Sequence, residues 1–276
     1  MSLDRPAGGR ELVVQREVTR TALDGLAGFA LAGSGAIREH GLTARPTEDV
    51  DLFTTSQDAA AFAGAVEQVT ARLQGSGYLV EETRRSAQFA RLHVESADGL
   101  QVDVDLGVDW RQDEPVRLEV GAVLSLADAV GNKVGALYSR GEARDYLDVD
   151  AIRASGRFSD AQLVTAAAER DAGFDLAMFA WRLDAARRVS LDDVTRYGVT
   201  ADELDAITAR CTQWAATLRE QPPVPATVEA GVDAARQASF PTPATEATRS
   251  APDPAPRPFR GPAAGPDRET GRGTGR

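Results

Sequence analysis

The sequence contains very little of several residue types that often mark a function. Its 276 residues include 1 cysteine, Cys211, and 2 histidines, which excludes an internal disulfide and a thiolate zinc site. A metal ion would therefore bind mainly carboxylate oxygen atoms, and such sites favour magnesium or manganese. No apolar run approaches the ~18 residues of a membrane span, and the N-terminus lacks the apolar segment of a signal peptide. We therefore expect a cytoplasmic protein with no membrane partner.

Lysine is almost absent as well. Of the 31 basic residues only Lys133 is a lysine, and all the others are arginines. An ammonium group does some chemistry that a guanidinium does not, so Lys133 is a candidate for a specific role. The net charge of -11 disfavours a broad nucleic-acid-binding surface, because phosphate affinity depends largely on clustered basic residues. A local basic patch is still compatible with this charge.

The first part of the chain alternates between helical and strand-like patterns. Helices are predicted over residues 10–27, 36–41 and 57–74, and strands over 29–34, 49–53, 78–83, 89–96 and 100–108. A turn at Asp98-Gly99 is suited to a hairpin between the last two strands. We expect an α+β core over residues 1–124, in which helices flank a mixed sheet.

From Ser125 onward the pattern becomes helical. Ser125 is suited to cap a helix that passes through Lys133, and further helices are predicted over 144–154, from Ser159, from Asp175 and from Thr200 to about Arg219. Residues 125–220 are therefore expected to form a helical domain that carries part of the active site. Most of the 14 prolines lie beyond this region, where large apolar residues are few, so we expect residues 221–276 to be a disordered tail.

Two aspartates on one predicted strand carry a chemical signal. Asp49 and Asp51 flank Val50, so their side chains project from the same face roughly 7 Å apart and can share a metal ion. An isolated pair of this kind is more often a solvated strand surface. Fifteen residues upstream of Asp49, however, a strand pattern ends in Gly33-Ser34 and leads into a helix, which offers backbone N–H groups and a hydroxyl to a phosphate. Together the two features predict a site for metal and phosphate.

The strand over residues 100–108 supplies candidates for a third carboxylate. Its alternation places Asp103 and Asp105 together on the face opposite its valines. We choose Asp105 as the third metal ligand and keep Asp103 as the alternative. The competing interpretation is that both are surface charges on a half-buried strand.

The order of strand, Gly-Ser turn, helix and Asp-x-Asp strand resembles the nucleotidyltransferase fold of the polymerase-beta type. Residues 30–42, 45–53 and 132–152 together resemble more closely the AbiEii/AbiGii nucleotidyltransferase toxin family, which belongs to bacterial toxin–antitoxin and phage-defence systems. The resemblance covers roughly residues 10–220. That family pairs a lysine early in a helix with an Arg-x-x-x-Arg-Asp-x-x-Asp stretch. The matching residues here are Lys133, Arg140, Arg144, Asp145 and Asp148.

This resemblance implies a role for each candidate residue. The metal ion, Mg²⁺ or Mn²⁺, would be bound by Asp49, Asp51 and Asp105. The nucleoside triphosphate would be bound by Gly33, Ser34, Arg45, Arg140 and Arg144. Lys133 and Asp148 would be catalytic together with the Asp49 and Asp51 pair, with Lys133 giving positive charge to the triphosphate. Asp148 would either orient Lys133 or act as a base toward the attacking hydroxyl. The chain departs from the family pattern at Gly35, which leaves phosphate binding intact.

The reaction implied is attack of a hydroxyl on the α-phosphate of a nucleoside triphosphate, with pyrophosphate leaving. The resemblance favours tRNA modification at the 3′ end and a cognate antitoxin as partner. The alternatives are an enzyme that modifies a small molecule, as aminoglycoside nucleotidyltransferases do, one that modifies a protein, and a non-catalytic nucleotide-binding partner protein. The acidic net charge disfavours an RNA acceptor unless five arginines form one basic patch: Arg84, Arg85, Arg91, Arg140 and Arg144.

The remaining candidates have structural interpretations. His40 is expected to cap the end of a helix, and His93 is expected to be structural. Phe174, Phe179 and Trp181 have near-helical spacing, and we expect them to pack in the core rather than stack on a base.

Overall fold

The computed structural model describes residues 8–47 and 49–220 of the chain. The tail expected over residues 221–276 lies outside this part.

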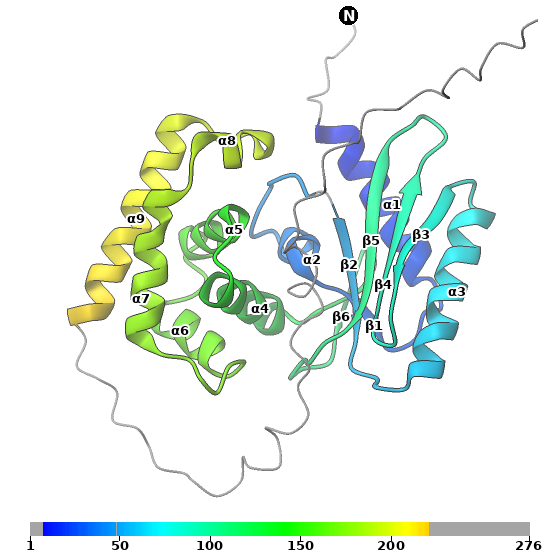
Figure 1. The fold of residues 1–276 in the computed structure, drawn as a ribbon, viewed down its shortest axis with the longest axis horizontal. Coiled ribbons are helices and arrows are strands. Elements are labelled where there is room, and N and C mark those ends of the chain that lie inside the picture. Colours follow the sequence, from blue (N-terminus) through cyan, green and yellow to red (C-terminus); the bar gives the residue numbers. More distant parts are fainter. Residues whose placement is uncertain (1–7, 48, 221–276) are drawn as a thin grey trace, which may run out of the picture. The chain divides into compact units, whose positions relative to one another are not determined.

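One mixed sheet contains all seven strands of the described residues (Figure 1). The strands are β1 (Phe29–Leu31), β2 (Asp49–Thr54), β3 (Leu79–Arg85), β4 (Phe89–Glu95), β5 (Gln101–Val108), β6 (Val116–Leu118) and β7 (Gly121–Val123). Their order is β3-β4-β5-β2-β1-β7-β6. β2 runs parallel to β5 and antiparallel to β1, while β4 and β5 form an antiparallel pair. This sheet and its helices confirm the expected α+β fold.

Helices account for most of the rest. Before the helical part come α1 (Gly8–Leu23), α2 (Gly33–Glu39) and α3 (Ala59–Gly75). The helical part contains α4 (Leu126–Ser139), α5 (Ala143–Ala154), α6 (Asp160–Ala168), α7 (Leu176–Asp184), α8 (Leu191–Val194) and α9 (Ala201–Glu220), with short 3-10 turns at Ala185–Arg188 and Thr195–Tyr197. None of the described helices combines the length and apolar character that crossing a membrane requires. Strands give way to helices after Val123, and the division into domains stays a prediction.

Alternation along the central strands gives the sheet one apolar and one acidic face. In β2, Val50 and Leu52 are fully buried, whereas Asp49 and Asp51 are only partly buried. The apolar face is packed against α1 and α3, and α3 buries Phe62, whose ring lies 6.2 Å from that of Phe29. The carboxylates are thereby left on the face that these two helices do not cover.

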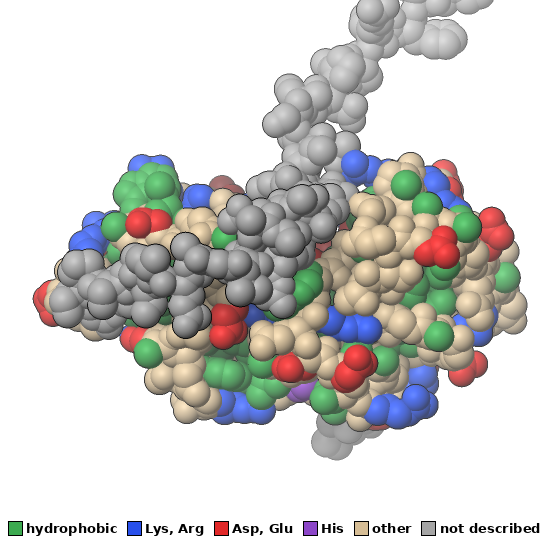
Figure 2. Space-filling view, turned by 90° about the horizontal axis from the view of Figure 1, so that it is seen from below, with side chains coloured by type: hydrophobic (Ala, Val, Ile, Leu, Met, Phe, Trp, Pro, Cys, Tyr) green, Lys and Arg blue, Asp and Glu red, His purple; other side chains and the backbone are tan. Residues whose placement is uncertain are grey.

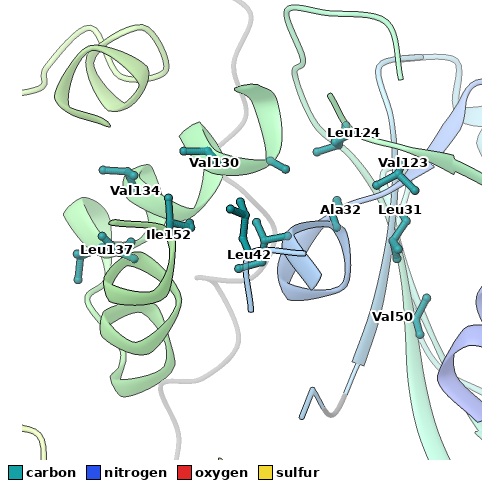
Figure 3. Close-up of a cluster of buried hydrophobic side chains, with 14 of the residues drawn as sticks. Leu31, Ala32, Leu42, Val50, Val123, Leu124, Val130, Val134, Leu137 and Ile152 are labelled. Atoms are coloured by element: carbon teal, nitrogen blue, oxygen red, sulfur yellow. The ribbon is translucent and has the colours of Figure 1, made fainter. Parts of the chain in front are cut away.

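A cluster of buried hydrophobic side chains joins α2 to the helical part (Figure 3). Leu42, just after α2, belongs to the same buried cluster as Val134 and Leu137 of α4 and Ile152 of α5. All four side chains are buried, and α2 contacts α4 directly. Burying apolar side chains on these elements fixes α2 against α4 and α5, so that polar groups on all three can converge.

The helix caps follow the sequence closely. Ser125 accepts the N–H of Asp128 at the start of α4, and Asp175 accepts the N–H of Met178 at the start of α7. Thr200 and Glu203 bond reciprocally at the start of α9, as expected for a capping box. His40 ends α2 as expected, and its Nε2 lies 2.8 Å from the carbonyl oxygen of Leu124.

Several boundaries differ from the sequence predictions. The helix expected from residue 36 begins at Gly33, because Gly33 and Ser34 form its first turn instead of a loop before it. The first helix ends at Leu23, ahead of Gly25, whose φ of 58° is left-handed. The short strands β6 and β7 were not predicted, since three-residue strands carry too little alternation to detect.

The aromatic cluster is only partly in the core. The Phe179 ring is fully buried and lies 5.3 Å from that of Trp214, and the Phe174 ring lies 4.7 Å from that of Tyr138. Trp181, by contrast, is 48% exposed, so the prediction that it packs in the core is wrong. Two residues along a helix turn a side chain by about 200°, which places Trp181 on the face opposite Phe179.

Acidic and basic side chains are interspersed on the face of the molecule drawn in Figure 2, with no large region of one sign. The described part of this face therefore carries no broad basic surface.

A buried carboxylate, Asp128 of α4, ties the loop before β6 to this helix and to the segment after α6. It accepts the backbone N–H groups of Gln112 and Asp113, the hydroxyl of Ser125 and the guanidinium of Arg170 at 2.7 Å. Replacing it removes four bonds and leaves Arg170 without its carboxylate.

We expect Asp128→Ala to lower the free energy of unfolding by about 3 kcal/mol, because a buried cation loses its partner. Urea denaturation followed by circular dichroism measures this. Asp205→Ala, on the exposed face of α9, is the matched control and should change stability by less than about 0.5 kcal/mol. Equal stability of the two variants would contradict the structural role of Asp128.

Candidate active site

Four polar side chains from four segments meet in a buried cluster: Ser34, Arg45, Lys133 and Asp148. The Lys133 ammonium donates to Ser34 Oγ at 2.7 Å and lies 2.9 Å from Asp148 Oδ2. Arg45 donates to both Asp148 oxygens at 2.9 Å and to Ser34 Oγ at 2.6 Å. Ser34 in turn donates its own proton to Asp148 at 2.9 Å. The structure therefore brings together residues that lie as far apart in the sequence as α2 and α5.

Two cations surround one carboxylate in this cluster. Asp148 is completely buried, and burial alone would raise its pKa, but the charges of Lys133 and Arg45 outweigh burial and lower it to about 2. Asp148 therefore stays ionised at neutral pH. The cluster carries one more positive than negative charge, which is favourable for an anion beside it.

Next to this cluster, four aspartates lie on the acidic face of the sheet. Asp49 is in register with Asp103, and Asp51 is in register with Asp105, on parallel strands about 4.8 Å apart. Burial raises the pKa of Asp51 to about 7, and the charges of Asp49 and Asp105 add to this effect. Neither carboxylate oxygen of Asp51 has a hydrogen-bond or ion-pair partner in the part of the chain that the structure describes. Asp51 thus sits where a cation would relieve repulsion.

The two outer aspartates face arginines. Arg91 donates to both oxygens of Asp105 at 2.6 Å, and Arg144 Nη1 lies 3.5 Å from Asp49 Oδ2. Among residues 8–47 and 49–220, no three His, Cys, Asp or Glu side chains converge closely enough to hold a metal ion. Asp49 and Asp51 suit a divalent cation, whereas Asp105 is engaged by Arg91 in this arrangement.

Gly33 joins the turn to the carboxylates. Its φ of 57° is left-handed, and a Cβ atom built on it would lie 1.8 Å from Asp51 Oδ2. The N–H of the preceding residue, Ala32, donates to the backbone oxygen of Asp51 at 2.8 Å. Only glycine allows the first turn of α2 to approach Asp51 this closely.

Arg140 has a different environment from Arg144. It donates to both oxygens of the buried Asp145 at 2.9 Å, and Asp145 also accepts the N–H of Glu142 at the start of α5. Arg140 and Asp145 therefore build the turn between α4 and α5. Arg144 is the arginine of this turn that reaches a sheet carboxylate.

The arginine patch expected for an RNA acceptor is incomplete. Arg91 and Arg144 lie at the carboxylates, and Arg84 lies over the ring of Phe89 at 5.2 Å. Arg85 instead contacts Glu82 and the carbonyl oxygen of Ala63 on α3, which packs on the apolar face. Successive side chains of a strand point to opposite faces of the sheet, so Arg84 and Arg85 lie on different faces.

Three contacts at the site were not predicted from the sequence. Arg91 lies opposite Asp105 across the β4–β5 hairpin, and counting outward from the Asp98-Gly99 turn would have found this pair. His93, expected to be structural, pairs with Asp103 at 2.9 Å in the same way. Tyr197 packs on Arg45, with the guanidinium carbon 4.7 Å from the ring centre. No sequence signal connects Tyr197 to Arg45, because their contact depends on how the helical part folds back.

The mixed sheet and its helices have the fold of nucleotidyltransferase toxins. The chain belongs to the family described as nucleotidyl transferase AbiEii toxin of type IV toxin–antitoxin systems, which matches residues 23–238. It is thus a nucleotidyltransferase of a toxin–antitoxin family.

Solved structures have a similar fold. MenT4, nucleotidyltransferase toxin Rv2826c from Mycobacterium tuberculosis H37Rv, aligns with a TM-score of 0.50 and 14% identity over 79% of this chain and 87% of that chain. JHP933 from Helicobacter pylori aligns with a TM-score of 0.46 and 18% identity over 76% of this chain and 92% of that chain. No curated protein matches the chain significantly.

The contact between Gly33 and Asp51 can be tested directly. Gly33→Ala is expected to lower nucleotide transfer about 100-fold, because the added Cβ must displace the Asp51 carboxylate. Transfer of labelled nucleotide from each nucleoside triphosphate measures the effect.

Gly41→Ala is the matched control. Gly41 also has a left-handed φ, of 73°, but a Cβ there meets nothing within 4 Å. It should cost about 1 kcal/mol of stability and leave the transfer rate of folded protein unchanged. Wild-type transfer by Gly33→Ala would show that the turn does not constrain Asp51.

Proposed function

We propose that the protein transfers a nucleoside monophosphate from a nucleoside triphosphate to the 3′ end of a tRNA, with a divalent metal ion. The observation that carries this proposal is the contact between two oppositely charged parts of one site. On one side of the Gly33-Ser34 turn, Asp49 and Asp51 provide negative charge. On its other side, the two positive charges of Lys133 and Arg45 outnumber the single negative charge of Asp148. A metal-bound triphosphate needs both kinds of charge.

The carboxylates would hold Mg²⁺ or Mn²⁺. Asp49 and Asp51 are the proposed ligands, and Asp105 becomes the third once Arg91 releases it. When bound, the ion would stabilise negative charge on the phosphate oxygens in the transition state.

The cluster beside them would bind the triphosphate. The backbone turn at Gly33 and Ser34 is proposed to cradle phosphate, with Arg45, Arg140 and Arg144 nearby. Lys133 is proposed to be catalytic, because its ammonium lies next to the turn and its charge is not fully used by Asp148.

Asp148 is proposed to orient Lys133. Its low pKa and its bonds from Lys133, Arg45 and Ser34 favour this role over that of a base, since a group so stabilised as an anion takes up a proton poorly. The acceptor hydroxyl would attack the α-phosphate and pyrophosphate would leave.

The family resemblance supports a tRNA acceptor and a cognate antitoxin as partner, and we place the reaction in the cytoplasm, where both substrates occur. The test is incubation of purified protein with each labelled triphosphate, magnesium and total tRNA, followed by proteins and aminoglycosides. Labelled tRNA supports the proposal. Label only on protein or on aminoglycoside would refute the tRNA acceptor, and nucleotide binding with no transfer would refute the enzymatic function.

Lys133→Arg is expected to lose at least about nine-tenths of the transfer activity although the charge is kept, because a planar guanidinium cannot replace a buried ammonium. Asp148→Asn should lose as much, since a neutral amide leaves Lys133 and Arg45 without their anion. Initial rates at saturating magnesium and triphosphate measure both.

Asp150→Asn is the matched control on the same helix. Its carboxylate pairs with the half-exposed Arg210 and should be dispensable for transfer. Circular dichroism of every variant separates loss of catalysis from loss of folding. Wild-type rates in the Lys133 and Asp148 variants would return both residues to a structural role.

The competition between Arg91 and the metal predicts an effect on metal affinity. Arg91→Ala should bind Mn²⁺ several-fold more tightly than wild type, because Asp105 is freed. Asp105→Asn should bind Mn²⁺ more weakly, and Asp51→Ala should lose both binding and nearly all transfer. Electron paramagnetic resonance of free Mn²⁺ measures binding without an activity assay.

Arg85→Ala is the control for this experiment. Arg85 lies on β3, the strand that pairs with the strand of Arg91, but its side chain contacts α3 instead of the carboxylates. It should bind Mn²⁺ as wild type does. Unchanged affinity in Arg91→Ala would mean that Asp105 is not a metal ligand.

A further inference from the structure

Helix α7 exposes a tryptophan that carries two arginines. The Cζ atoms of Arg182 and Arg188 lie 5.5 and 5.7 Å from the centre of the Trp181 ring. Trp181 and Met178, one turn apart, are each 48% exposed and line a shallow groove together with Asp175 and Ala177. Because the two half-exposed side chains are contiguous, they form an apolar surface that is a candidate for ligand binding.

The charges of these two arginines are not neutralised. Arg182 donates to the carbonyl oxygens of Tyr138 at 3.1 Å and Ser139 at 2.8 Å. Neither Arg182 nor Arg188 forms an ion pair with a carboxylate of the described residues. Their neighbours differ, because Arg187 and Arg219 both pair with Asp184. The positive charge of these two arginines therefore remains available to an anion, and the carboxylate in the same groove, Asp175, caps α7 by accepting the N–H of Met178.

A short turn connects this surface with the active site. Arg182 packs against Gly141, where an added Cβ would lie 2.6 Å from its Cδ. Gly141 belongs to the turn between α4 and α5, and Arg144 at the start of α5 reaches Asp49 at 3.5 Å. α7 also contacts α4 directly (Figure 1). The turn that carries Arg144 therefore also contacts Arg182, the residue next to Trp181.

We propose that Trp181, with Arg182 and Arg188, binds single-stranded RNA: the Arg188 guanidinium moves from the indole ring to a phosphate, and the face that it leaves stacks on one base. An indole face accepts any base, and guanidinium groups attract the phosphate backbone. An acidic protein segment would use the charges but has no planar base to place on the ring. The further statement that the bound RNA is the acceptor, with its 3′ end at the carboxylates, rests on the proposed function.

The test uses a fluorescein-labelled single-stranded RNA oligonucleotide of mixed sequence, with binding followed by anisotropy. Trp181→Ala should weaken binding about tenfold, which is about 1.4 kcal/mol, and Trp181→Phe should keep most of it. Arg188→Ala should lower the slope of log affinity against log salt by about 0.7. Arg182 is not altered, because its bonds to the end of α4 are structural.

Trp110→Ala is the matched control. Trp110 is also an exposed tryptophan, at 38%, with an arginine 5.6 Å from its ring, but that arginine, Arg170, is paired with Asp128. Its replacement should leave RNA affinity unchanged. Binding of a fluorescent triphosphate should be unchanged in all of these variants, since none touches the catalytic cluster.

The outcomes separate this proposal from the proposed function. Wild-type RNA affinity in Trp181→Ala, or no RNA binding by the wild type, would overturn the RNA surface. Transfer to tRNA with an unaltered KM for tRNA in Trp181→Ala would also overturn it and leave the proposed function standing. RNA binding that depends on Trp181 without any transfer to RNA would support the surface and refute the tRNA acceptor. A polyglutamate peptide is the competitor. If it displaces the RNA, and if its own binding is lost in Trp181→Ala, the surface binds an acidic protein and the RNA proposal is overturned.

Discussion

The buried contact of Asp148 with Lys133 and Arg45 is the interaction on which the rest of the site depends. Taking three charges out of water costs several kcal/mol for each ion, and only their mutual attraction and the Ser34 hydroxyl offset this cost. Because its partners come from α2, the loop after it, α4 and α5, the cluster is satisfied only when all four segments are in place. The buried apolar cluster that α4 and α5 share with α2 and Leu42 contributes the free energy that holds them there.

The sheet side of the site obeys a different constraint. Strand register places Asp49, Asp51 and Asp105 together, and register follows from the apolar alternation of β2 and β5, which cannot slip without burying aspartates. The fold thus forces like charges into proximity. Arg91 and Arg144 relieve the outer pair, but the central carboxylate faces its neighbours with a raised pKa. Stability of the sheet and affinity for a cation therefore arise from the same alternation.

Features set by local periodicity could be predicted from the sequence, and those set by distant packing could not. The aspartate faces and the helix starts at Ser125 and Thr200 need only spacing and capping chemistry. The partnership of Arg91 with Asp105 was within reach through the hairpin turn. Trp181 was misassigned because its spacing from Phe174 suits one helical face, whereas α7 begins only at Leu176 and buries Phe179 instead. The contact of Tyr197 with Arg45 joins segments that no local pattern relates.

The unequal use of arginine and lysine has a geometric explanation at this site. Arg45, Arg91 and Arg140 each place two nitrogen donors on the two oxygens of one carboxylate, which is what a planar guanidinium does best. Lys133 instead contacts two different groups, the Ser34 hydroxyl and one oxygen of Asp148. An ammonium has three N–H donors, so these two contacts leave one donor unused. In the proposed reaction that donor faces the triphosphate, whereas a guanidinium bound to both oxygens of Asp148 would hold its remaining N–H donors in the fixed plane of that contact.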